Sequence, residues 1–158
     1  MNRRTLLAAT AASGLLGLAA CAPGGAPDIV DIAASNPDSF STLVAAVQAA
    51  GLEETLRGDG PFTLFAPTDA AFARLPDGTV ETLLEPENRD QLVSVLTYHV
   101  VPGAVTSDQI AGTRVDVATV QGQELHVDGR DGVVVNGSSR VVAADIAASN
   151  GVIHAIDR

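Results

Sequence analysis

Short β-branched runs separated by turn pairs fill the second half of the chain, and this pattern limits the fold more than any other feature. From Thr113 onward the turn pairs include Asn136-Gly137 and Asn150-Gly151, which are typical of tight connections between strands. The runs between the turns predict strands over residues 115–120, 124–128, 133–136, 141–146 and 152–157. Strands that follow a group of helices favour an α+β, β-rich sandwich over a parallel sheet of βαβ units.

Before Thr113 the apolar residues follow a helical period. One helix is predicted from Asn36-Pro37, an N-cap residue followed by a proline suited to the first turn, to Gly51, which suits a left-handed C-cap. Its buried face consists of apolar residues spaced i, i+3, i+4 and i+7, namely Phe40, Leu43, Val44 and Val47. Three further elements are predicted, a helical turn over 52–56, a strand over 62–66 and a helix over 88–98.

Residues 1–20 have the design of a secretory signal peptide. Arg3 and Arg4 precede a short apolar run that is rich in small residues. The run is too short for a comfortable membrane span, so we expect an exported protein. The paired arginines fit both general secretion and twin-arginine export, and the route stays open.

The sequence Leu18-Ala19-Ala20-Cys21 resembles the lipobox of bacterial lipoproteins, in which the cysteine is lipidated and becomes the new N-terminus. This resemblance implies a lipid attachment at Cys21 and a place in the cell envelope, at the outer membrane or a periplasmic membrane face. The alternative is an ordinary signal peptide and a secreted protein. Residues 21–27 are rich in proline, glycine and alanine and predict a flexible tether. Residues 28–158 remain for one domain.

Charge and cysteine content exclude several classes of protein. The formal net charge is −10, and every basic residue is an arginine without any basic cluster. Such a chain is not expected to bind nucleic acid. A single cysteine excludes an internal disulfide framework and a metal site built from several cysteines.

Three motifs along the chain resemble those of one family. Residues 62–72 read FTLFAPTDAAF, residues 150–157 read NGVIHAID, and Tyr98-His99 lies between them. Together they resemble the two signature boxes and the central Tyr-His motif of fasciclin-like domains. The resemblance implies a wedge of two packed β-sheets with helices along one edge. It also implies association with cell adhesion or extracellular matrix, no catalytic activity and no cofactor.

The two boxes contain residues for which we predict structural roles. Thr68 is expected to cap a short helix, and Asp69 to satisfy backbone N–H groups at the start of that helix. Asn150-Gly151 is interpreted as a turn pair in which the glycine takes a positive φ before the final strand. His154 is expected to be a core histidine.

The remaining titratable residues offer no clear metal or calcium site. The three histidines lack the i, i+3 or i+4 spacing that builds a site on one helix. His126 alternates with apolar neighbours and should face solvent, whereas His99 falls on the apolar face of its helix and is expected inside the core. Residues 128–131 fit a hairpin turn better than a calcium loop.

Catalysis is the minority hypothesis. Asp69, Tyr98, His99 and Ser107 supply the residue types for acid–base or nucleophilic chemistry, but no nucleophile elbow, phosphate loop or HExxH pattern accompanies them. In animal proteins that this chain resembles, the Tyr-His motif is implicated in integrin-dependent adhesion. Our interpretation is that Tyr98 and His99 fix the local fold, so that their substitution disturbs adhesion indirectly.

The sequence therefore predicts a lipid-anchored, monomeric binding module of the cell envelope that meets a surface protein or polysaccharide. Two alternatives remain at this point. One is a periplasmic enzyme that uses Asp69, Tyr98 and His99, and the other is a passive structural protein of the envelope.

Overall fold

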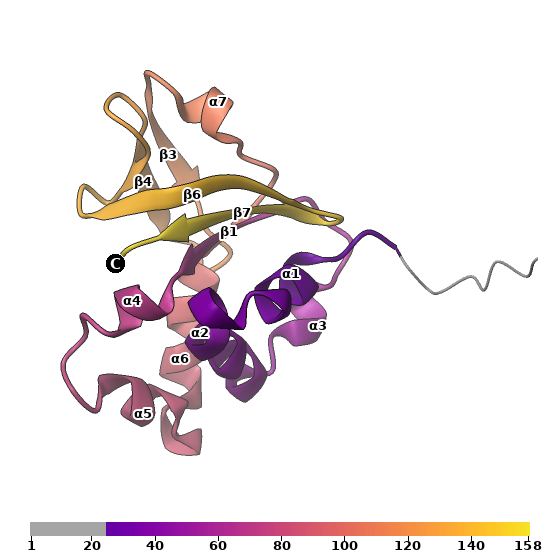
Figure 1. Cartoon of the computed structure of the whole chain (residues 1–158), viewed down its shortest axis with the longest axis vertical. Helices are drawn as coiled ribbons and strands as arrows, with labels where there is room; N and C mark the ends of the chain where they lie inside the picture. The colour runs from indigo at the N-terminus through magenta and orange to yellow at the C-terminus, as the bar shows by residue number, and fades with distance from the viewer. Residues whose placement is uncertain (1–24) are drawn as a thin grey trace, which may run out of the picture.

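The computed structural model describes residues 25–158 (Figure 1). The predicted signal peptide, the predicted lipid-attachment residue Cys21 and the first part of the predicted tether lie outside the described residues. The helices are α1 (Ile29–Ser35), α2 (Pro37–Ala50), α3 (Glu53–Leu56), α4 (Asp69–Phe72), α5 (Thr79–Leu84), α6 (Arg89–Tyr98) and α7 (Ser107–Ile110), with a 3₁₀ turn at Pro86–Asn88. The strands are β1 (Phe62–Pro67), β2 (Val100–Pro102), β3 (Arg114–Ala118), β4 (Glu124–Asp128), β5 (Val134–Val135), β6 (Ser139–Ala148) and β7 (Gly151–Ile156).

The strands form a sheet in the order β2-β1-β7-β6-β5-β4-β3. Strands β1 and β7 are parallel, and the other neighbouring pairs are antiparallel. The long strand β6 belongs to both arms of the sheet, because it pairs with β7 along most of its length and with β5 at Ser139 and Arg140. Figure 1 shows the arm with β3 and β4 on one side of β7 and β1, and the larger helices on the other.

Alternation along β1 and β7 divides the core into two clusters. Leu64 and Ile153 face the helices and pack with side chains of α1, α2 and α6. Phe65 and Ile156 point the opposite way and pack against β4 and β5, as the period of two in a strand requires. Because Phe65 is 0% exposed, its burial alone stabilises the fold by about 1.5–3 kcal/mol. The predicted α+β wedge of packed sheets with a helical edge is confirmed.

Local details differ from the sequence expectations at the start of α2. Asn36 precedes the helix as predicted, but its side chain makes no cap bond and instead donates from Nδ2 to the Ile32 carbonyl at 2.8 Å. That carbonyl belongs to α1, which the sequence did not predict. At the other end, Gly51 has φ +70° and closes α2 in the left-handed conformation, as expected.

Candidate functional site

The first signature box is a helix-capping centre. Thr68 accepts a hydrogen bond from the Ala71 amide at 3.3 Å and caps α4, as predicted from its position. The Asp69 carboxylate does not cap its own helix, which corrects the sequence expectation. It accepts hydrogen bonds from the Ser41 amide at 3.2 Å, the Ser41 hydroxyl at 2.7 Å and the Thr42 amide at 2.9 Å, all in α2.

This contact coincides with a break in α2. Phe40 has φ −131° and ψ 19°, which are not helical values, so the helix restarts at Ser41. A helix start leaves backbone N–H groups without intrahelical partners. Asp69 satisfies two of them from a different part of the chain. Burial raises the pKa of Asp69, but the hydrogen bonds from Ser41 and Thr42 outweigh this effect and hold the pKa below its ordinary value.

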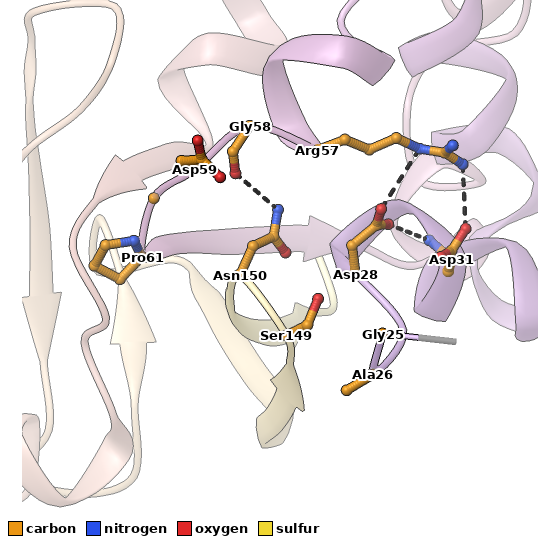
Figure 2. Close-up of a pocket in the computed structure, with 11 residues that line it drawn as sticks. Gly25, Ala26, Asp28, Asp31, Arg57, Gly58, Asp59, Pro61, Ser149 and Asn150 are labelled. Carbon is orange, nitrogen blue, oxygen red and sulfur yellow. Dashed lines mark hydrogen bonds and ion pairs between the residues drawn. The ribbon is translucent and has the colours of Figure 1, made fainter. Parts of the chain in front are cut away.

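The second signature box begins at a junction of several chain segments (Figure 2). The Asn150 side chain accepts from the Ile29 amide at 3.1 Å and donates to the Leu56 carbonyl at 2.5 Å. Its backbone carbonyl accepts from the Phe62 amide at 2.9 Å. Asn150 therefore fastens the start of α1 and the end of α3 to the start of β1.

The reason for glycine at position 151 differs from the prediction. Gly151 is not among the residues with positive φ, so left-handed backbone geometry does not select it. A Cβ atom at this position would overlap the backbone carbonyl of Phe62 on the neighbouring strand. Close approach of β1 and β7 excludes a side chain here.

His154 lies in the wedge with both ring nitrogens bonded. Nδ1 accepts from the Asp145 amide at 3.3 Å, so the proton is on Nε2, which donates to the Val105 carbonyl at 2.7 Å. The side chain is 0% exposed and stacks on Phe65 with the ring centroids 5.4 Å apart. These contacts join β7 to β1, to β6 and to the loop before α7.

Asp145 is a residue that the sequence reasoning missed. Its φ is +56°, in a part of β6 where the register with β7 shifts. Its carboxylate accepts from the Ser107 amide at 2.8 Å and from the Ser107 hydroxyl. These hydrogen bonds lower the pKa of Asp145. An aspartate within a β-branched run gives no periodic signal in the sequence. The feature that distinguishes Asp145 is a positive φ at a residue other than glycine, and only the structure reveals it.

Tyr98 and His99 close the end of α6 in different surroundings. The Tyr98 hydroxyl accepts from Asn136 Nδ2 at 2.9 Å, which joins α6 to the turn between β5 and β6. His99 Nδ1 donates to the Val95 carbonyl at 2.7 Å, one turn earlier in the helix. The two rings meet edge to face with centroids 5.9 Å apart.

His99 is half-buried, whereas the sequence predicted a core position. The residue follows the last turn of α6 as its C-cap. It lines a small apolar pocket of about 160 Å³ together with Phe72, Leu75 and Val95. Burial lowers the pKa of His99, partly opposed by the hydrogen bond to the Val95 carbonyl.

Several exposed polar and charged residues of the β3–β4 arm are paired with one another. His126 faces solvent on β4, as expected, and its Nδ1 lies 2.5 Å from the Asp116 carboxylate on β3. After β4, the Arg130 guanidinium contacts both oxygens of Asp128, at 3.1 and 2.8 Å. Hydrogen bonds from Arg130 lower the pKa of Asp128 to about 2. The Asp128 carboxylate is thus engaged by an arginine.

The four residues of the catalytic hypothesis belong to separate networks. Asp69 binds α2, Tyr98 binds Asn136, His99 binds its own helix, and Ser107 binds Asp145. Over residues 25–158, no group of three or more His, Cys, Asp or Glu side chains is placed to hold a metal ion. Within the same range, no helix combines the length and apolar character needed to cross a membrane. Each of these four polar side chains is hydrogen-bonded to a different partner within the fold.

The fold is a compact β-wedge module, made of a bent sheet with a layer of helices. Hydrogen bonds from the signature side chains connect its segments. Residues 38–158 match the Fasciclin domain, and the chain belongs to this family of cell-adhesion and cell-surface proteins. It is 55% identical over 130 residues to protein sll1483 of Synechocystis, covering 82% of this chain and 71% of that protein. It is 39% identical over 140 residues to the cell surface glycolipoprotein MPB83 of Mycobacterium bovis, covering 85% and 60% respectively.

A solved structure shares the fold. The FAS1 domain pair of the insect cell adhesion molecule fasciclin I aligns with a TM-score of 0.73 and 18% sequence identity. The alignment covers 83% of this chain and 49% of that one. The fold predicted from the three motifs is therefore confirmed.

Proposed function

We propose that this protein is a lipid-anchored adhesion module of the cell envelope, which binds a protein or polysaccharide on another surface and catalyses no reaction. The observation that carries the non-catalytic part of this proposal is that Asp69, Asn150 and His154 bind backbone groups of their own domain. A catalytic group needs geometric access to a reacting atom. Asp69 and His154 have their hydrogen-bonding atoms directed at the fold itself.

Membership of the family supports the adhesive part of the proposal. Fasciclin I, the protein of the solved structure, is a cell adhesion molecule, and MPB83 is a cell surface glycolipoprotein. The anchor rests on the lipobox ending in Cys21. Several acyl chains on one residue give stable membrane attachment, because each buried methylene contributes about 0.8 kcal/mol.

In this proposal Tyr98 and His99 preserve the adhesive surface by fixing the end of α6. Tyr98 joins α6 to Asn136, and His99 closes the last turn of the helix through the Val95 carbonyl. Loss of either side chain is expected to lower stability and adhesion together. Lost adhesion with an unchanged melting curve would instead assign them a direct contact.

The two parts of the proposal have separate tests. Mass spectrometry of the membrane fraction should find a diacyl or triacyl modification at Cys21, and soluble protein with an unmodified cysteine would refute the anchor. For adhesion, beads carrying the protein through the Cys21 thiol should bind cells of the strain that encodes it more strongly than beads carrying heat-unfolded protein. Equal binding by both kinds of bead would refute a folded adhesive surface.

A further inference from the structure

Two consecutive residues of one turn bind the chain just before and at the start of α1. Ser149 and Asn150 connect β6 to β7 and lie beside Asp28 in Figure 2. The Ser149 amide donates to the Pro27 carbonyl at 2.9 Å, and the Asn150 side chain accepts from the Ile29 amide at 3.1 Å. The two bonds therefore hold the chain on both sides of Asp28. We call Ser149, Asn150 and these two bonds the Asn150 clasp.

The clasp is in turn held by the interior of the fold. Asn150 donates from Nδ2 to the Leu56 carbonyl, and its own carbonyl accepts from the Phe62 amide. It leads directly into β7, which pairs with β1 from Gly151 to Ile156 and with β6 on the other side. A pull on residue 27 or 29 is thus passed to the middle of the sheet.

Apart from the burial of α1 side chains in the core, the other contacts at this end are weak. Helix α1 has seven residues, which is too short to be stable alone. Arg57 lies 3.6 Å from Asp28 and 3.1 Å from Asp31. The Arg57 and Asp31 side chains are half exposed, and ion pairs at the surface contribute little. Ile29 is 0% exposed, so peeling α1 away would open the core between the helices and the sheet.

We infer that the Asn150 clasp is a mechanical device that keeps α1 and the core closed when tension enters the domain through its N-terminal tether. This inference rests on the proposed function, because an anchored adhesion module is loaded between its tether and its partner. A pull along the chain from the N-terminal side loads the Pro27 bond first and the Ile29 bond next, so both bonds must break before α1 is pulled from the core. Asn150 is the positioning residue of the device.

Optical tweezers can test the inference on the full chain produced without export. Cys21 is the only cysteine and supplies one attachment, and Val142→Cys on the exposed side of β6 supplies the other. Asn150→Ala should raise the rate of opening at a fixed load roughly tenfold, the effect of losing hydrogen bonds of ordinary strength. A control geometry with Cys21→Ala, Asp77→Cys and Val142→Cys bypasses the clasp and should show a smaller increase.

Two further variants keep the test decisive. Asn36→Ala removes an asparagine bond from the C-cap of α1 back to the Ile32 carbonyl, and should leave the opening rate under tether load within about twofold of wild type. If Asn150→Ala does not fold, Asn150→Ser keeps a hydroxyl that cannot serve both Ile29 and Leu56, and should give a smaller increase with the same dependence on geometry. An equal change in both geometries, or none, would overturn the inference. Neither lipid nor partner is present, so such a failure would leave the adhesion proposal intact.

Discussion

Replacing Asp69 tests whether the first signature box stabilises the fold across two helices. Asp69→Ala removes the acceptor for the Ser41 and Thr42 amides at the point where α2 restarts after Phe40. A lost N-cap costs about 1 kcal/mol, and up to about 2 kcal/mol where more than one donor is served. Asp69 is partly exposed, so water can replace some of the lost bonds. We expect a loss of about 1–2 kcal/mol in the free energy of unfolding.

Conservative and pH controls sharpen this prediction. Asp69→Asn keeps one acceptor oxygen and should lose about half as much as Asp69→Ala. The exposed Asp77→Ala should change the free energy of unfolding by less than about 0.5 kcal/mol. Because the folded state lowers the pKa of Asp69, its contribution is complete above the ordinary aspartate pKa. That contribution should disappear as the pH falls through the lowered value.

The assay is urea unfolding followed by circular dichroism, at neutral pH and again in acid. The loss corresponds to a fall in Tm of roughly 4–8 °C for a domain of this size. Stability of Asp69→Ala equal to wild type would refute the capping role. So would a gap between wild type and Asp69→Ala that widens in acid.

Three further predictions concern the other signature residues. His99→Ala should lower Tm. Because burial lowers the pKa of His99, the wild type should lose stability as the pH falls below the ordinary histidine pKa, and urea titration should show that the variant loses less. Gly151→Ala should cost about 3 kcal/mol or more, since its Cβ would meet the backbone of Phe62, and a melting curve like that of wild type would disprove the overlap. Tyr98→Phe should cost about 1 kcal/mol through the lost bond from Asn136, and a double-mutant cycle with Asn136→Ala should show coupling of that size.

Most of the strands were predictable because their signal is local, whereas β2 was not predicted. The run 124–128 coincides with β4, and the final strand moved by only one residue, since turn residues mark these ends directly. Helix α1 was not predictable from its seven residues. Its stability comes from burial of Ile29 and from the bond to Asn150, which lies far away in the sequence.

The site shows the same division between local and distant causes. Thr68 caps the helix that follows it, so its role could be inferred from adjacent residues. Asp69 and Gly151 were correctly singled out, but the roles predicted for them were wrong. Each contacts a segment that is distant in the sequence and is brought near only by the fold. The approach of Ser41 to Asp69 and of Phe62 to Gly151 has no signature in the sequence. Tertiary contacts decide what a signature residue does.

Adhesion of a gene-deletion strain tests the central claim most directly. Cells lacking the gene should detach from surfaces and from one another more readily under flow than wild-type cells. Complementation with the wild-type gene should restore attachment, whereas a Cys21→Ala gene exported in equal amount should not. Normal adhesion of the deletion strain under all tested conditions would contradict an adhesive function, and full rescue by Cys21→Ala would contradict the need for the anchor.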